Sequence, residues 1–220
     1  MQTNKSYILI SFILSISVLI SGCKTLDPYT GEEKVRSSVK YGAIGAAICG
    51  AIGSRDSSKR ARNAALGCGL IGAAIGAYMD KQEKQLRKSL ENTGVSVKRE
   101  GDQIRLIMPG NITFATGQSN LQESFLPVLN SVVTVLREYD QTIVEVQGYT
   151  DSTGSLDLNM RLSKDRAQRV SDYLERGDII PQRLIVVGKG PADPIATNAN
   201  ETGRAQNRRV EINLRAIEGS

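Results

Sequence analysis

The chain has 220 residues, which is room for one ordinary domain with appended segments, and it contains neither Trp nor His. Without His, the usual general base near neutral pH and the commonest metal ligand are missing, so we expect no metal, cofactor or His-based triad. The formal charge is +5, but basic and acidic residues alternate without a basic stripe interleaved with aromatic residues. Nucleic acid is therefore not an expected partner.

The N-terminus has the features of an export signal. Lys5 supplies a positive charge, and the apolar run 7–20 that follows is too short to span a membrane. The run closes with Ile20-Ser21-Gly22-Cys23, which resembles the lipobox of bacterial lipoproteins. The resemblance implies that residues 1–22 are a lipoprotein signal peptide and that Cys23 is lipidated. The alternative is a plain signal peptide with a Cys at this place by chance.

The segment after Cys23 predicts a membrane tether. Several acyl chains on one residue give stable anchoring. Lys24 follows Cys23, and by resemblance to the enterobacterial sorting rule a residue other than Asp at this position implies the outer membrane. Residues 23–40 are polar, with charges of both signs and a turn at Asp27-Pro28, so we interpret them as a lipidated polar tether.

Two Gly/Ala-rich apolar runs follow, at 41–53 and 64–79, separated by a basic loop. Small residues recur at three- and four-residue spacing, which lets helices approach closely, so the runs predict an antiparallel helical hairpin. A hairpin centred between residues 58 and 59 sets Cys49 opposite Cys68, and an oxidising periplasm would permit a disulfide there. The runs resemble the glycine-zipper segment of YiaD-type lipoproteins. The alternative is a loosely packed spacer.

Each Gly/Ala-rich run falls short of the roughly 20 residues that span a bilayer. We therefore expect the hairpin to associate with itself, with other copies or with the membrane surface. Residues 80–92 are highly charged, and Leu86 and Leu90 are one helical turn apart. This pattern predicts that the second zipper helix continues as a solvated helix and stops at Asn92-Thr93-Gly94, so that the hairpin and the charged helix occupy residues 41–94.

The remaining residues, 95–220, alternate between strand and helix patterns. Apolar residues at helical period predict helices over 121–139, after cap candidates at Ser119 and Asn120, and over 158–174, before Gly177. Strands are predicted at 104–108, 142–149, 184–188 and 208–214. The alternation predicts an α/β fold of the α+β sandwich kind, in which helices pack on a mixed sheet.

The segment from 150 to 170 is the most informative part of the chain. The strand that precedes it ends in Gly148, a turn holds Asp151, and an amphipathic helix carries Arg166. An acid at a strand end and a base on the next helix can converge on one cleft and together suit a small zwitterion. The spacing of the two, with Asn159 and Leu162-Ser163 between them, resembles the peptidoglycan-binding motif of the OmpA C-terminal-like domain. The match continues in Asn207-Arg208-Arg209-Val210-Glu211-Ile212 and covers roughly residues 95–215.

The resemblance implies a pocket for diaminopimelate, whose side chain ends in an ammonium and a carboxylate on one carbon. Asp151 is expected to accept from the ammonium, and Arg166 to grip the carboxylate through two parallel hydrogen bonds. The residues expected to line or brace this pocket are Thr150, Thr153, Gly154, Asn159 and Arg209, with the choice between Arg208 and Arg209 as the residue that approaches the ligand left open. Relatives often carry Asp or Asn where this chain has Ala115.

The function expected from these features is that of a non-catalytic outer-membrane lipoprotein that binds peptidoglycan and faces the periplasm. One alternative is a membrane-associated homo-oligomer built by the glycine zippers, with the C-terminal domain as its wall anchor only. Another is a glycan-cleaving hydrolase that uses two carboxylates, for which Asp151 and Asp157 are the nearest candidates.

Overall fold

The computed structural model describes residues 24–26, 33–35, 58–115 and 117–217. The chain divides into two compact units, Met1–Asp80 and Lys81–Ser220. Cys23, Cys49 and the first Gly/Ala-rich run lie outside the described residues, as does the side chain of Cys68. The lipidation, the hairpin and the disulfide therefore stay predictions.

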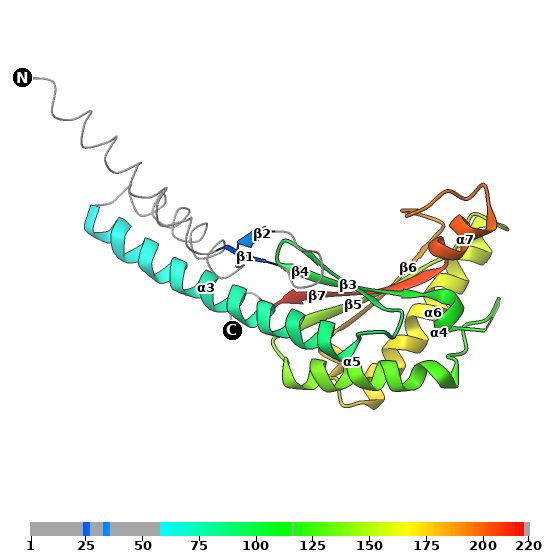
Figure 1. The fold of residues 1–220 in the computed structure, drawn as a ribbon, viewed down its shortest axis with the longest axis horizontal. Coiled ribbons are helices and arrows are strands. Elements are labelled where there is room, and N and C mark those ends of the chain that lie inside the picture. Colours follow the sequence, from blue (N-terminus) through cyan, green and yellow to red (C-terminus); the bar gives the residue numbers. More distant parts are fainter. Residues whose placement is uncertain (1–23, 27–32, 36–57, 116, 218–220) are drawn as a thin grey trace, which may run out of the picture. The chain divides into compact units, whose positions relative to one another are not determined.

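The first unit contains two short strands and most of a long helix. Strands β1 (Lys24–Leu26) and β2 (Glu33–Val35) pair antiparallel within the stretch predicted as a tether. Helix α3 (Ser58–Ser89) is continuous and joins the second Gly/Ala-rich run to the charged segment, as predicted (Figure 1). The backbone beyond it turns through positive φ angles at Asn92 and Gly94. No helix among the described residues has the length and apolar character needed to cross a membrane.

The charged end of α3 belongs to the second unit, and one of its faces is buried. Leu86 and Leu90 are almost fully buried, and the Gln82 amide donates to the Thr142 hydroxyl at 3.4 Å. On the same helix, Arg87 and Glu83 form a 3.0 Å ion pair one turn apart. The prediction of a wholly solvated helix was therefore wrong on this face, because the leucine pair at one-turn spacing forms a packing stripe.

The second unit is built on a five-stranded mixed sheet in the order β3-β4-β7-β5-β6. Its strands are β3 (Ser96–Glu100), β4 (Gln103–Pro109), β5 (Thr142–Tyr149), β6 (Leu184–Gly190) and β7 (Arg209–Ala216). Strands β5 and β6 pair parallel and all other neighbours antiparallel. The four predicted strands are confirmed. Strand β3 was not predicted, because this edge strand buries only Val97.

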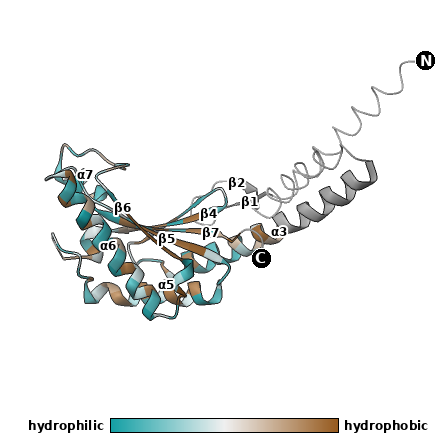
Figure 2. Ribbon diagram, turned by 180° about the vertical axis from the view of Figure 1, so that it is seen from behind, coloured by the Kyte–Doolittle hydropathy of each residue, from teal (hydrophilic) through white to brown (hydrophobic). Residues whose placement is uncertain are grey.

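Helices α5 (Leu126–Glu138) and α6 (Leu156–Arg176) cover one face of the sheet (Figure 1). The central strands turn alternate apolar residues toward them, and hydrophobic colour is concentrated along these strands in Figure 2. The shorter helical segments are α4 (Gly110–Thr113), η1 (Glu123–Phe125), η2 (Pro181–Arg183) and α7 (Glu201–Asn207). The fold class is as predicted, an α+β domain with helices packed on a mixed sheet.

Helix α5 begins later than predicted. The apolar period points to a start near Leu121, but the helix begins at Leu126 after the short η1 turn. Pro127 lies in its first turn, where a residue without a backbone N–H is best tolerated. Leu121 instead forms an isolated β-bridge with Phe114, so Ser119 and Asn120 do not cap the helix.

Helix α6 has the predicted extent, but its first half does not pack as predicted. Leu158 was assigned to the buried face, yet it is 52% exposed, whereas Asn159, Ser163 and Arg166 are buried. The cause is close backbone approach: a methyl group on Gly148 would overlap the carbonyl oxygen of Ser163. Only small or polar side chains fit between helix and sheet here, and Ser163 Oγ accepts from the Gly190 N–H at 2.9 Å.

Candidate functional site

The candidate site lies where β5 ends and the chain turns into α6. Thr150 is almost fully buried and its N–H donates to Gly190 O at 2.8 Å, which ties the strand end to β6. Asp151 follows, with Oδ1 accepting from the Thr153 N–H at 2.8 Å in an Asx-type turn. Gly154 takes a φ of 92°, which closes this turn at no steric cost.

Asn159 braces this turn from α6, because its side-chain amide donates to Thr153 O at 3.0 Å. Helix α6 itself is capped at Ser155, whose hydroxyl oxygen accepts from the Leu158 N–H. The structure therefore brings Thr150, Thr153, Gly154 and Asn159 together around Asp151, the place that the sequence motif gave them.

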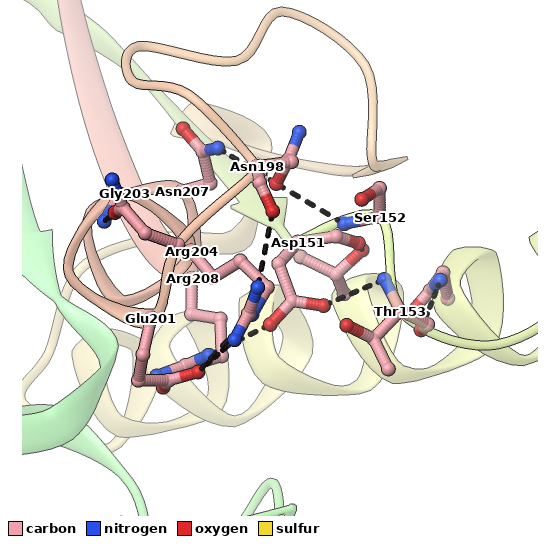
Figure 3. A network of polar contacts seen from close by, with 12 residues as sticks. Asp151, Ser152, Thr153, Asn198, Glu201, Gly203, Arg204, Asn207 and Arg208 are labelled. Carbon is pink, nitrogen blue, oxygen red and sulfur yellow. Dashed lines mark hydrogen bonds and ion pairs between the residues drawn. The ribbon is translucent and has the colours of Figure 1, made fainter.

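Asp151 forms an ion pair with Arg208, which lies at the C-terminal end of α7. Arg208 Nη1 donates to Asp151 Oδ2 at 2.7 Å, and Nη2 donates to Glu201 Oε1 at 2.6 Å (Figure 3). Burial alone would raise the pKa of Asp151, but the hydrogen bonds from Arg208 and Thr153 outweigh it and hold this pKa below its ordinary value. Asp151 is therefore a stable carboxylate near neutral pH.

Arg166 is 4% exposed, and only some of its guanidinium nitrogens donate hydrogen bonds. Its Nε donates to Gln118 O at 3.0 Å, and its guanidinium carbon lies 5.2 Å from the centre of the Phe114 ring. Its Nη1 is buried and has no hydrogen-bond partner among the described residues. Burial, and then the charge of Arg208, lower the pKa of Arg166, while the charge of Asp151 acts in the opposite direction.

The structure does not bring Arg209 to Asp151. Arg209 Nε donates to Glu211 Oε1 at 2.7 Å, and its guanidinium lies 3.7 Å from the centre of the Tyr149 ring. Burial first, and then the charge of Glu211, raise the pKa of Tyr149 to about 12. Of the two arginines left open by the sequence, Arg208 is therefore the one that contacts Asp151, whereas Arg209 pairs with Glu211. A part for Arg209 in ligand binding stays a prediction.

Two further residues build the site: Asn207, which the sequence motif included without assigning it a role, and Asn198, which was not predicted. Asn207 Oδ1 accepts from the N–H groups of Ile195 and Ala196, and its amide donates to Asn198 Oδ1 at 2.9 Å. Asn198 Oδ1 also accepts from the Ser152 N–H at 3.3 Å, so the loop before α7 is joined to the Asp151 turn (Figure 3). For Asn198 the available sequence signal was the Asn-rich composition of residues 198–207.

The arrangement suits binding more than hydrolysis. A glycan-cleaving enzyme needs one carboxylic acid with a raised pKa, whereas the pKa of Asp151 is lowered. Asp157, the other candidate, lies exposed in the first turn of α6. A carboxylate and a buried, incompletely paired guanidinium on neighbouring elements instead match a ligand that carries both signs of charge.

Known proteins resemble the chain in both of its parts. The OmpA family matches residues 113–208, and the YMGG-like Gly-zipper family matches residues 1–84. The probable lipoprotein YiaD of Escherichia coli is 44% identical over 215 residues, covering 96% of this chain and 98% of that protein. The peptidoglycan-binding protein ArfA of Mycobacterium tuberculosis is 39% identical over 109 residues, which cover 50% of this chain and 33% of that protein.

Solved structures share the fold of the second unit. The cell wall anchor of the type VI secretion system of Pseudomonas aeruginosa is 31% identical, with a TM-score of 0.56, and covers 61% of this chain and 96% of that one. A putative MotB-like protein from Desulfovibrio vulgaris has a TM-score of 0.58 over 65% of this chain and 94% of that one, at 24% identity, which shows the fold alone. The chain therefore belongs to the OmpA family, as a YiaD-type member with a Gly-zipper segment ahead of its OmpA domain.

Proposed function

We propose that this protein is an outer-membrane lipoprotein that binds peptidoglycan non-covalently, through the side-chain end of diaminopimelate, and so links the membrane to the cell wall. The observation that carries the proposal is the buried guanidinium nitrogen Nη1 of Arg166, which donates no hydrogen bond to any described residue. A buried cation is costly unless it is paired, and the Nη1 of Arg166 has no partner among the described residues. A ligand carboxylate would supply the missing acceptor.

The remaining contacts determine how such a carboxylate would bind. Gln118 O already takes the Nε of Arg166, so the carboxylate would meet the terminal Nη1 and Nη2 pair as a fork. The ligand ammonium would then lie at Asp151, whose carboxylate stays ionised. The family relationship supports the same ligand class, because similar proteins are named as peptidoglycan-binding and as a cell wall anchor.

The direct test of this proposal is co-sedimentation with purified diaminopimelate-type sacculi. A soluble fragment should begin at Lys81, because Gln82, Leu86 and Leu90 pack within the second unit. We expect wild type to sediment with sacculi, and the Asp151→Ala variant to lose at least ~30-fold in affinity, since breaking a desolvated charge pair from one side costs about 2–5 kcal/mol. Asp165→Ala, an exposed change of the same charge on α6, is the matched control.

The ligand assignment has a test of its own. Sacculi with lysine in place of diaminopimelate lack the carboxylate that Arg166 would bind, and amidated diaminopimelate lacks the anionic charge. We expect both to bind more weakly than the unmodified wall. Equal binding to lysine-type and diaminopimelate-type sacculi would reject the assignment, even if the domain bound the wall through another surface.

Membrane attachment through Cys23 is a separate part of the proposal. The similar Escherichia coli protein is named a probable lipoprotein, and the lipobox-like ending of residues 1–22 supports the same processing here. Cys23→Ser should leave the signal segment uncleaved. A Cys23→Ser chain that is cleaved and fractionates with the outer membrane like wild type would contradict it.

A further inference from the structure

Arg208 occupies the position that a ligand ammonium would need to share. Its Nη1 already donates to Asp151 Oδ2, while Asp151 Oδ1 accepts from the Thr153 N–H. A carboxylate has about four lone-pair positions, so an ammonium can join Asp151, but two cations then compete for one anion. Binding of the ammonium therefore requires an alternative carboxylate partner for Arg208.

Glu201 offers that alternative partner. Its Oε1 accepts from Arg208 Nη2 at 2.6 Å, and its Oε2 accepts from Arg204 Nη2 at 2.9 Å. Arg204 Nη1 in turn donates to Asn198 O at 3.1 Å, which joins this ion pair to the loop before α7 (Figure 3). Hydrogen bonds from Arg208 and then Arg204 lower the pKa of Glu201, so this carboxylate is charged near neutral pH.

We propose that Glu201 is a positioning residue that draws Arg208 away from Asp151 when the ligand ammonium binds. This inference rests on the proposed diaminopimelate site. Arg208 bridges two carboxylates, so releasing Asp151 costs it one hydrogen bond and leaves its second one intact. Asp151 exchanges one cation for another and is never left as a buried, uncompensated charge.

The exchange fits the exposure of the three groups. The Asp151 side chain is 11% exposed, that of Arg208 is 31% exposed and that of Glu201 is 65% exposed. Arg208 therefore moves outward along a gradient of increasing solvation, and its guanidinium gains water as it leaves the carboxylate.

A double-mutant cycle tests the proposal with the full chain purified in detergent and a muramyl tripeptide that ends in diaminopimelate as the probe. Glu201→Gln should weaken binding by about 3- to 10-fold, because Arg208 is then left with Asp151 as its carboxylate partner. Arg208→Gln removes the competitor, so this variant should bind at least as tightly as wild type. In the Arg208→Gln background, adding Glu201→Gln should have no further effect.

Two control changes of matching charge are Glu175→Gln and Arg169→Gln, both exposed on α6 and expected to bind like wild type. Circular dichroism and thermal melting establish that each variant is folded. Should Arg208→Gln fail to fold, Arg208→Lys replaces it, since a single ammonium cannot bridge two carboxylates as the guanidinium does. Glu201→Gln should then weaken binding less in the Lys background than in wild type.

The outcomes separate this proposal from the one on which it rests. If Asp151→Ala binds the tripeptide like wild type, the diaminopimelate site itself is wrong. If Asp151→Ala abolishes binding while Glu201→Gln does not change it, only the exchange is wrong. The exchange is also overturned if Glu201→Gln weakens binding equally with and without Arg208, or if Arg208→Gln loses as much affinity as Asp151→Ala.

Discussion

A buried arginine lies at each end of β5: Arg183 near its start and Arg166 near its end. The guanidinium groups of the two differ in how many of their nitrogens donate hydrogen bonds. Arg183 and Arg166 are both 4% exposed. At the start of the strand, Arg183 Nε donates to Thr142 O at 2.7 Å, Nη1 to Leu136 O at 2.9 Å and Nη2 to Tyr139 O at 2.9 Å. At the end of the strand, Arg166 donates through Nε to Gln118 O, and its Nη1 is left without an acceptor among the described residues.

The difference shows that burial alone does not separate a structural cation from a binding one. Arg183 holds the end of α5 by donating to the carbonyl oxygens of Leu136, in the last turn of the helix, and of Tyr139, directly after it. Nearly all buried polar groups in folded proteins are hydrogen-bonded. The unmatched Nη1 of Arg166 is therefore a candidate for an acceptor that a ligand supplies, because the charge of Asp151 acts on the same guanidinium. The comparison therefore predicts opposite behaviour for the two arginines on substitution.

The largest expected effect is on stability, from Arg183→Gln. This change removes charge-assisted hydrogen bonds and leaves several buried carbonyls unpaired, so we expect a loss of about 3–5 kcal/mol in the free energy of unfolding. Chemical denaturation at neutral pH measures it. The folded fraction should still bind sacculi like wild type. A loss below about 1 kcal/mol would mean that these carbonyls are easily resolvated and that the contrast between the two ends is weaker than the contacts suggest.

Arg166→Met should behave in the opposite way. Replacing an incompletely paired buried cation by an apolar side chain is often neutral or stabilising, so we expect the free energy of unfolding to stay within about 1 kcal/mol of wild type. Affinity for diaminopimelate-type sacculi should fall at least ~30-fold. Arg166→Lys should recover only part of this loss, because an ammonium cannot form the two-pronged contact. A Met variant that unfolds as readily as Arg183→Gln would place Arg166 among the structural cations.

Sequence patterns predicted the fold well and placed Asp151 in a turn after a strand and Arg166 on the following helix, where the structure has them; their role in ligand binding stays a prediction. Alternation of strands and helices is a local property, and the strand–turn–helix spacing of Asp151 and Arg166 is short enough for sequence to define. Arg183 escaped notice, because its acceptors belong to α5 and β5, more than 40 residues earlier along the chain. The spacing of apolar residues along the chain cannot indicate a contact between residues so far apart in sequence.

The choice between Arg208 and Arg209 was equally beyond local patterns. Arg208 caps the C-terminus of α7 and Arg209 is the first residue of β7, so the two side chains belong to different elements and reach different partners. Which one reaches Asp151 depends on where α7 ends and on the Glu211 and Tyr149 side chains that receive Arg209. The exposure of Leu158 likewise depends on the close approach of Ser163 to Gly148 and not on the apolar period of α6.

A smaller effect should appear when the stability contribution of Asp151, at the end of β5, is measured as a function of pH. Because the pKa of Asp151 in the folded state lies below its ordinary value of 3.8, its carboxylate stabilises the fold fully above pH 3.8. That contribution is lost as pH falls through the folded-state pKa. The stability difference between wild type and Asp151→Asn should be about 1 kcal/mol at neutral pH and should shrink below pH 3.8.

Urea denaturation of the two proteins at pH 7, 5 and 3 measures this dependence. Asp165→Asn, an exposed change of the same kind on α6, is the control for general acid effects and should track wild type at all three values. A difference between wild type and Asp151→Asn that grows as the solution is acidified would contradict the ion pair with Arg208, since the protonated form of Asp151 would then be the one that stabilises the fold.

The smallest expected effect comes from Leu158→Ala, in the half of α6 that follows the Asp151 turn. Leu158 is 52% exposed, so its truncation should change the free energy of unfolding by no more than about 0.5 kcal/mol. Leu174→Ala, the same change in the other half of the same helix, removes a fully buried side chain and should cost about 2–5 kcal/mol. Denaturation of both variants measures the contrast. A loss above 1 kcal/mol for Leu158→Ala would mean that α6 is held to the sheet by apolar packing along its whole length. The site would then not depend on the close, polar contact that places Ser163 against Gly148 and buries Arg166 beside the turn of Asp151.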